Sequence, residues 1–337
     1  MHAETKQYQD VRRSVRGLLA NLPTRGPSVF HRTAWDRLAD HGFTTIGIPE
    51  ELSGAGGDDA AAIAVIEEVA RAGVSLPLLE HLWLAGWALA HQGLPLPAGV
   101  CGFATAELSI GRAGEDWVVT GSAARVPWAR VADQLVLVAP EVGTVVVPVT
   151  AVAIQPASDV LGVPQDRVGL DSVRLPAGAV RASSPSSEEI AARVLAGRLS
   201  QIRAAARAAL KITLRYVTTR EQFGRPLARF QAVQQRLACA AAEVALLDMG
   251  AELARHGSPL DAAMARVDAA RSVAVVSSQA HQLHGAMGVT AEYGLGRLTL
   301  AMRAWLSSTG PDDAWHRRVG AALSEDLWRS VIGESLD

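Results

Sequence analysis

The turn TTREQFGRPLARFQ, residues 218–231, carries side chains that could bind a ligand with a phosphate and an aromatic ring. Arg220 offers forked donors for a phosphate, and Gln222 and Gln231 can bond hydroxyl groups or ring edges. Phe223 can form a wall against a flat ring. An arginine at a helix C-terminus can also simply complement the helix dipole or pair with a carboxylate. That structural role accounts for Arg220 but not for the glutamines and the phenylalanine around the same corner.

A second corner, HQLHGAMGVTAEYGLGR, covers residues 281–297 and is rich in glycine and polar residues. Gly285 and Gly288 would let the backbone approach a ligand closely, because glycine lacks a Cβ atom. By composition alone, a ligand site and a pair of structural turns account for the two corners equally well.

Long helical patterns surround both corners. Ser186 and Glu189 have the spacing of a capping box, and apolar residues after them keep a period near 3.6 as far as Val217. Short connections between successive helices predict antiparallel neighbours and therefore a four-helix bundle over residues 185–337. The further helices are predicted at about residues 227–257, 261–285 and 297–306, with a continuation beyond 312.

The middle of the chain, residues 99–178, changes to short β-branched segments such as DWVVTGSA, DQLVLVAP and GTVVVPVT. They are bounded by Gly, Pro and Asp, which predicts antiparallel strands of a small sheet or barrel. No long helical pattern interrupts them, so a parallel dinucleotide-binding sheet is disfavoured.

The first 98 residues are predicted to be mainly helical. In DDAAAIAVIEEVARAG, Asp58 is a natural helix cap and Gly73 ends the apolar pattern. The glycine-rich loop GIPEELSGAGGD precedes this helix. Because the loop lacks both the strand-then-GxGxxG context and the lysine of a phosphate-binding loop, it is not interpreted as one. The predicted fold class is therefore α+β, in the order helices, strands, helices.

The composition of the 337 residues favours a cytoplasmic protein. Hydrophobic residues make up 49% of the chain and support a large core, while a net charge of −2 gives no indication of a nucleic-acid or membrane-surface protein. The N-terminal residues lack the apolar core of a signal peptide, and no apolar run reaches a membrane-spanning length. Cys101 and Cys239 stand far apart without metal-ligand spacing and are interpreted as buried small hydrophobes, so no metal site is predicted.

Taken together, these segments resemble the acyl-CoA dehydrogenase family. GIPEELSGAGGD followed by VIEEVARAG is similar to the N-terminal helical signature of that family. TTREQFGRPLARFQAVQQRLA is similar to its R-x-x-FG…Q corner, and QLHGAMGVTAEYGLGR to its Q-x-x-GG-x-G-x-x-x-EY segment. The resemblance covers nearly the whole chain. It implies a helical domain at 1–98, a small antiparallel β domain at 99–178, and a C-terminal four-helix bundle at 185–337.

The resemblance also implies a flavoprotein oxidoreductase of lipid metabolism that uses FAD to oxidise acyl-CoA thioesters to the α,β-unsaturated product. In this family FAD lies across a subunit interface, and an electron-transferring flavoprotein is the implied electron acceptor. The residues that would contact the pyrophosphate and adenosine of a neighbour's FAD are Arg220, Gln222, Phe223, Gln231, Gln282, Gly285 and Ala286. One departure is Ala286, which stands where the family has its second glycine and would restrict the backbone.

The catalytic glutamate of the family is missing from its usual position. Counting forward from Glu292 and Tyr293 without gaps places Thr309 there, and a threonine hydroxyl is no general base at neutral pH without a stronger partner. Some members carry the base earlier, but Val194 occupies that position. No catalytic residue is therefore assigned.

The β domain departs from the family pattern as well. Its G-S-D loop is absent, and Arg125-Val-Pro127 stands where a W-I-T strand would line the flavin. Trp128 is next to it and is interpreted as a core residue. The part of the FAD site offered to a neighbour is thus kept, and the part that holds flavin and base is lost.

This pattern resembles the shortened subunit of paired α2β2 acyl-CoA dehydrogenases, in which a homologous partner carries the glutamate. Such enzymes are associated with steroid degradation, which implies a bulky steroid-type acyl group. Two alternatives remain open at this point. The chain could be a self-sufficient homomeric dehydrogenase with Asp312, Asp313 or Glu292 as base, or a non-catalytic binding or scaffold homologue.

Overall fold

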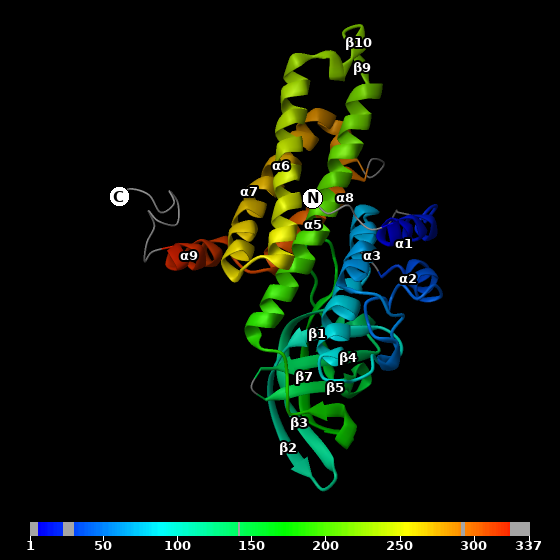
Figure 1. The fold of residues 1–337 in the computed structure, drawn as a ribbon, viewed down its shortest axis with the longest axis vertical. Coiled ribbons are helices and arrows are strands. Elements are labelled where there is room, and N and C mark those ends of the chain that lie inside the picture. The colour runs from blue at the N-terminus through cyan, green and yellow to red at the C-terminus, as the bar shows by residue number, and fades with distance from the viewer. Residues whose placement is uncertain (1–5, 23–29, 141, 291–293, 324–337) are drawn as a thin grey trace. The chain divides into compact units, whose positions relative to one another are not determined.

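A computed structural model describes residues 6–22, 30–140, 142–290 and 294–323 of the chain (Figure 1). The chain separates into two compact units, residues 1–193 and 194–337. The first unit contains both the N-terminal helices and the strands, so the division of residues 1–178 into two domains remains a prediction. Within the described residues, no helix is long and apolar enough to cross a membrane.

The helical part of the first unit is organised around α3, Asp59–Arg71, which is buried on nearly all sides. Its N-cap is Asp58, as predicted, and the Asp58 carboxylate accepts a hydrogen bond from the backbone N–H of Ala61 at 2.9 Å. Glu68 is buried on α3 and pairs with Arg16 of α1 at 2.6 Å, which ties the two helices together. The remaining helices before α3 are α1 (Lys6–Leu18), α2 (Arg32–Ala39) and η1 (Glu50–Leu52).

The segment after α3, in the part of the chain predicted to be mainly helical, is not a plain α-helix. It forms a π-helix, η2 (Leu79–Gly86), which continues as the α-helical turn α4 (Trp87–Ala90). All eight residues of η2 are buried. The residues of η2, which include the buried Glu80 and His81, do not distinguish the wider helical turn from an ordinary one, so the sequence carried no signal for it.

The strands form two four-stranded sheets, with orders β1-β4-β5-β8 and β2-β3-β7-β6. All pairings in these sheets are antiparallel except β1 with β4, which is parallel and differs from the predicted all-antiparallel arrangement. The first sheet consists of β1 (Cys101–Thr105), β4 (Gln134–Ala139), β5 (Gly143–Pro148) and β8 (Val180–Arg181). The second consists of β2 (Glu107–Ala113), β3 (Asp116–Pro127), β6 (Ala153–Gln155) and β7 (Gln165–Leu175). Short helices η3 (Ala129–Val131), η4 (Val149–Ala151) and η5 (Ala177–Ala179) connect the strands.

Helix α5, Ser187–Thr219, starts in the first unit and continues into the second. The predicted capping box precedes it: the backbone N–H of Ser186 donates to Glu189 Oε2 at 2.8 Å, and that of Glu189 donates to Ser186 Oγ at 3.2 Å. A second capping box at Ser258 starts α7.

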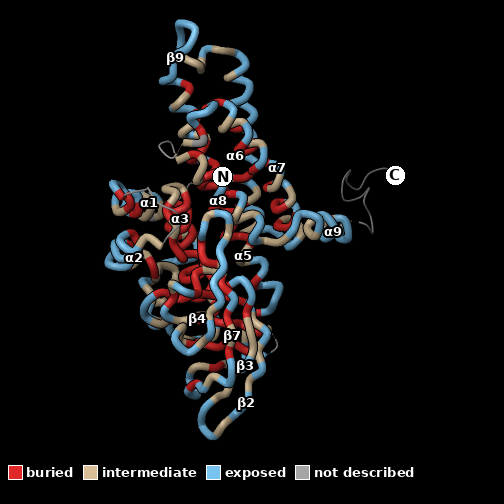
Figure 2. The backbone as a smooth tube through the Cα atoms, turned by 180° about the vertical axis from the view of Figure 1, so that it is seen from behind, coloured by how far each residue is buried: buried red, intermediate tan, exposed pale blue. Residues whose placement is uncertain are grey.

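The second unit packs the long helices side by side around an alanine- and leucine-rich core, shown in red in Figure 2. Ile202, Val276 and Met302, from three different helices, are fully buried in it. Its elements after α5 are β9 (Glu221–Gln222), β10 (Arg225–Pro226), η6 (Leu227–Arg229), α6 (Gln231–His256), α7 (Pro259–His284), η7 (Gly285–Val289), α8 (Leu295–Ser308) and α9 (Asp312–Leu323).

Candidate cofactor site and the position of the catalytic base

The first sequence corner folds as a small hairpin between α5 and α6. Helix α5 ends at Thr219, β9 and β10 pair as two short antiparallel strands, and the hairpin extends past the ends of both helices (Figure 1). The corner is closed by the backbone N–H of Leu227, which donates to the Arg220 carbonyl at 2.9 Å. Gly224, with φ +79°, makes the tight turn that only glycine adopts without strain.

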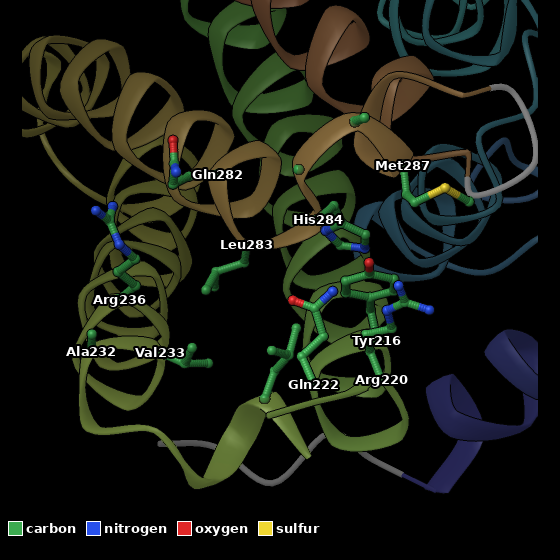
Figure 3. Close-up of a pocket in the computed structure, with 13 residues that line it drawn as sticks. Tyr216, Arg220, Gln222, Ala232, Val233, Arg236, Gln282, Leu283, His284 and Met287 are labelled. Carbon is green, nitrogen blue, oxygen red and sulfur yellow. The ribbon is translucent and has the colours of Figure 1, made fainter. Parts of the chain in front are cut away.

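A pocket of about 480 Å³ lies where this hairpin meets the end of α7 and the turn η7. Five of the seven predicted cofactor-binding residues line it: Arg220, Gln222, Gln282, Gly285 and Ala286. Figure 3 shows Arg220 and Gln222 on one side of the pocket and Gln282 across from them. The fold therefore brings the two sequence corners, about 60 residues apart, together at one site.

The other two predicted residues do not line this pocket. Phe223 lies in the turn between β9 and β10, 88% exposed, with φ +53° and its ring edge-on to Phe230. Gln231 is exposed in the first turn of α6. A large aromatic side chain held in a strained conformation and left mostly in solvent contributes little to the fold beyond its contact with Phe230.

The pocket contains three notable residues that the sequence reasoning did not select. Tyr216 and His284 stack with ring centroids 4.4 Å apart and planes inclined by 20°, and they form one wall. Arg236 contributes a second guanidinium from α6. The sequence contains a weak indication of this position, because Ala232 and Arg236 are spaced i, i+4 and therefore lie on the same face of the helix.

The glycines of the second corner have different roles. Gly285 has φ +57°, and a Cβ atom there would meet nothing within 4 Å, so its backbone is open toward a ligand. Gly288 is instead a packing position, since a Cβ atom would come within 2.9 Å of His284 Cβ and 3.2 Å of His281 Nδ1. Ala286 does not have a positive φ, so the alanine in place of the family glycine costs no backbone strain.

The electrostatics of the pocket favour an anion. None of its 13 lining residues is an aspartate or glutamate, and no described carboxylate lies within 4 Å of Arg220 or Arg236. Burial lowers the pKa of His284, which keeps that imidazole neutral at pH 7. The residues present, two cations, two amides and an open glycine, fit the diphosphate part of a dinucleotide.

Thr309, at the expected base position, is part of a structural network around the buried Arg266. It caps the C-terminus of α8, and its hydroxyl donates to the Leu306 carbonyl at 2.6 Å. The same hydroxyl oxygen accepts from Arg266 Nε at 2.5 Å. Arg266 is 1% exposed and also donates to the Gly310 carbonyl at 3.0 Å. A hydroxyl held by a guanidinium and a carbonyl takes up no further proton, so Thr309 is no general base.

The aspartates considered as alternative bases are ion-paired. Asp312 accepts from Arg266 Nη2 at 2.9 Å, and Asp313 pairs with Arg317 at 2.6 Å. The hydrogen bond from Arg317 lowers the pKa of Asp313 below its usual value of 3.8. Asp313 is thus stabilised as an anion in the first turn of α9, and Asp312 is engaged by Arg266. The third alternative, Glu292, lies outside the described residues.

In the β domain, the segment that stands in place of the flavin-lining strand is only partly in the core: Val126 is fully buried, whereas Arg125 is exposed. Trp128 is 4% exposed and packs edge-on against Phe30 with ring centroids 6.3 Å apart, which confirms its interpretation as a core residue. Cys101 is buried as predicted, whereas Cys239 is exposed, which corrects its interpretation as a buried hydrophobe. In the described ranges, no group of three or more His, Cys, Asp or Glu side chains could hold a metal ion.

Comparison with known proteins identifies the class of protein that this fold and pocket define. Residues 5–95 match the acyl-CoA dehydrogenase N-terminal domain, and residues 192–323 match the acyl-CoA dehydrogenase C-terminal domain. The chain is also 31% identical to acyl-CoA dehydrogenase IpdE2 of Mycobacterium tuberculosis over 274 residues, which is 78% of each chain. The chain therefore belongs to the acyl-CoA dehydrogenase family, whose members are FAD-dependent flavoproteins, and the predicted fold class is confirmed.

Solved structures with the same fold include proteins built from two different chains. One chain of the ChsE4–ChsE5 complex from Mycobacterium tuberculosis superimposes with a TM-score of 0.80 at 23% identity, covering 96% of this chain and 99% of that chain. A chain of the Tcur3481–Tcur3483 steroid ACAD gives a TM-score of 0.78 at 22% identity, with the same coverage. At this identity the likeness establishes the fold alone.

Proposed function

We propose that this chain is a subunit of a heteromeric acyl-CoA dehydrogenase and supplies one part of an FAD site to a partner subunit. The partner would carry the catalytic glutamate, and the assembly would remove hydrogen from the α and β carbons of an acyl-CoA thioester. The observation that carries this proposal is the state of Thr309. Its hydroxyl is committed to Arg266 and Leu306, so the usual base position is used for the fold.

The pocket at the hairpin supports the cofactor part of the proposal. Arg220, Gln222 and Gln282 line it together with Gly285, where an added Cβ atom would meet nothing within 4 Å. A ligand shared with another chain would also explain Phe223, which is strained and almost fully exposed at the tip of the hairpin. An aromatic side chain in that position would be covered only when a partner binds.

In such an assembly FAD would supply the hydride-accepting ring, and this chain would bind and orient its diphosphate. Arg220 would provide charge-assisted hydrogen bonds to the phosphate oxygens. Gln222 and Gln282 would donate neutral hydrogen bonds, which fix position without changing the charge of the site. The α-proton would go to the carboxylate of the partner, because this chain places no unpaired described carboxylate at its own customary base position.

The substrate and the electron acceptor are proposed by likeness. A bulky, steroid-type acyl group is supported by the shared fold with the Tcur3481–Tcur3483 steroid ACAD. The β domain, in which Trp128 is turned into the core, is consistent with a subunit that holds no flavin ring of its own. An electron-transferring flavoprotein is the proposed acceptor.

The test is to produce the chain alone and together with a homologous subunit that retains the glutamate. We expect FAD retention and dehydrogenase activity only in the complex. In the complex, Arg220→Ala should lower FAD occupancy at least about tenfold, because one charge-assisted contact to a diphosphate is lost. Arg229→Ala is the matched control, since Arg229 is an exposed arginine of the same corner that does not line the pocket.

Two results would contradict the proposal. A yellow, active homo-oligomer of this chain alone would favour a self-sufficient enzyme over a heteromer. Unchanged FAD occupancy in the Arg220→Ala complex would remove the cofactor role of the pocket. A stable, colourless protein that gains no activity with any homologous partner would indicate a scaffold instead.

A further inference from the structure

Arg236 lines the same pocket from α6 and is held there by a neutral side chain. Its Nη1 donates to Gln279 Oε1 of α7 at 2.8 Å, which fixes the guanidinium between the two helices. Figure 3 shows Arg236 across the pocket from Arg220, with Leu283 between them. The pocket is therefore flanked by a cation on each side.

The partner of Arg236 differs from those of other arginines on these helices. Arg207 pairs with Asp248 at 2.7 Å, and Arg203 and Arg271 pair with Glu252 and Glu243. Each of these carboxylates orients the guanidinium of its arginine and also neutralises the positive charge of that arginine. The Gln279 amide orients Arg236 in the same way but leaves the positive charge available.

A fixed, uncancelled charge next to a cavity is suited to an anionic ligand. Holding an arginine side chain in one conformation costs rotamer entropy, and the amide contact offsets that cost before a ligand arrives. The pocket wall near Arg236 is otherwise apolar, with Ala232 and Val233 on the same helix. Arg236 and Ala232 are themselves exposed to solvent, so the attraction between the guanidinium and a phosphate depends on ionic strength.

We infer that Arg236 is a second phosphate-binding residue of this pocket, positioned by Gln279, and that Arg220 and Arg236 together hold a nucleotide diphosphate from two sides. This inference rests on the proposed function of the pocket as a nucleotide site, and it adds the residue that selects a diphosphate over a monophosphate. A single phosphate engages one of the two arginines, whereas a diphosphate presents oxygens to both.

The experiment measures the affinities of ADP and AMP for the full-length chain by calorimetry. The wild type is expected to prefer ADP. Arg236→Ala should weaken ADP about tenfold, the equivalent of one charge-assisted contact, and change AMP much less, so that the preference is lost. Arg236→Lys should keep part of the preference for ADP, because lysine carries the positive charge but lacks the two-pronged hydrogen-bonding group of arginine. Arg229→Ala, at an exposed arginine outside the pocket, should change neither affinity.

Substitutions of Gln279 test whether it positions the Arg236 guanidinium or only packs against it. Gln279→Leu should weaken ADP moderately, since the guanidinium loses its support but keeps its charge. Gln279→Glu should weaken ADP more, because a carboxylate beside Arg236 cancels that charge and repels phosphate. A packing role for Gln279 would give the opposite order, with the near-isosteric glutamate tolerated better than leucine. Thermal melts of each variant establish that the chain is folded.

The outcomes separate this inference from the proposed function. If Arg220→Ala weakens ADP while Arg236→Ala leaves the preference for ADP over AMP intact, the pocket remains a nucleotide site and the role of Arg236 is wrong. If neither substitution affects ADP or FAD, both proposals are wrong. If the wild type does not bind ADP at millimolar concentration, the two-arginine site is also wrong, because this chain contains both of its cations.

Discussion

Two regions of the C-terminal unit use arginine in opposite ways. At the hairpin end, Arg220 and Arg236 face a pocket whose lining contains no carboxylate. At the junction of α8 and α9, Arg266 is buried and bonds the Leu306 and Gly310 carbonyls, the Thr309 hydroxyl and Asp312. In the first region the fold leaves the charge available to a ligand, and in the second it uses the charge to join its own helices.

In our proposal the usual base position of the family falls in the second region. Thr309, which stands there by sequence counting, is a helix cap held by a buried guanidinium. A carboxylate at that position would be drawn into an ion pair with Arg266 and held as a weak base. The loop between α8 and α9 therefore contributes to the stability of the fold. The pocket at the hairpin instead contains cationic side chains that the fold does not need.

The largest effect is expected for Arg266→Ala. The substitution leaves a cavity, two carbonyls and a hydroxyl without their buried donor, so we expect a loss of about 3–5 kcal/mol in the free energy of unfolding. Urea unfolding followed by circular dichroism measures it. Arg317→Ala is the control, because its pair with Asp313 is exposed on both sides and should contribute far less to the free energy of unfolding. Equal effects of the two substitutions would refute the contrast between buried and exposed arginines.

A smaller effect is expected for Thr309→Val, which keeps the shape of the side chain and removes its hydroxyl. Arg266 Nε then loses its acceptor, and the expected cost is about 1–2 kcal/mol of stability. The activity of the chain in complex with its partner should not change, since Thr309 takes no part in proton transfer in our proposal. A large fall in activity at unchanged stability would instead assign Thr309 to the reaction and break the comparison.

The sequence predicted local structure where the signal is local. The Ser186–Glu189 capping box, the Asp58 cap and the long helices follow from spacing over a few residues, and each is confirmed. The counting that placed Thr309 at the base position also needed only local spacing. Its clamp could not be predicted in the same way, because Arg266 lies 43 residues away on another helix.

For the site, five predicted residues meet in one pocket because two helix ends bring both motifs together. Arg236 was missed because α6 is apolar over much of its length, and an isolated arginine there has the pattern of an ordinary surface residue. Gly288 was assigned to a ligand, although its lack of a Cβ serves the packing of His281 and His284. Such distinctions depend on tertiary neighbours, which no single helix specifies.

The smallest predicted effect concerns pH and tests whether the arginines alone give the pocket its charge at neutral pH. His284 packs against Tyr216 of α5, and His281 bonds Thr299 of α8 at 2.9 Å. Burial is the main cause that lowers the pKa of both imidazoles below 6.5. The charges of His284 and Arg303 lower the pKa of His281 further, whereas the hydrogen bond to the Ala280 carbonyl partly raises the pKa of His284. Both side chains are therefore neutral at pH 7.

Because the folded-state pKa values are lowered, acid affects folding and binding in opposite directions. Below about pH 6.5 the unfolded chain takes up protons before the folded chain does, so the stability of the ligand-free protein should fall. A bound phosphate favours the imidazolium, so ADP affinity should be constant from pH 8 to 7 and rise a few-fold only below 6.5. ADP itself takes up a proton near that pH, so the measurement compares the wild type with His284→Gln, in which the rise should be reduced. A rise in ADP affinity that starts above pH 7 would mean that a histidine of the pocket is already partly protonated at neutral pH. The positive charge of the pocket would then come from three cations, and its comparison with the buried Arg266 would no longer rest on the two arginines alone.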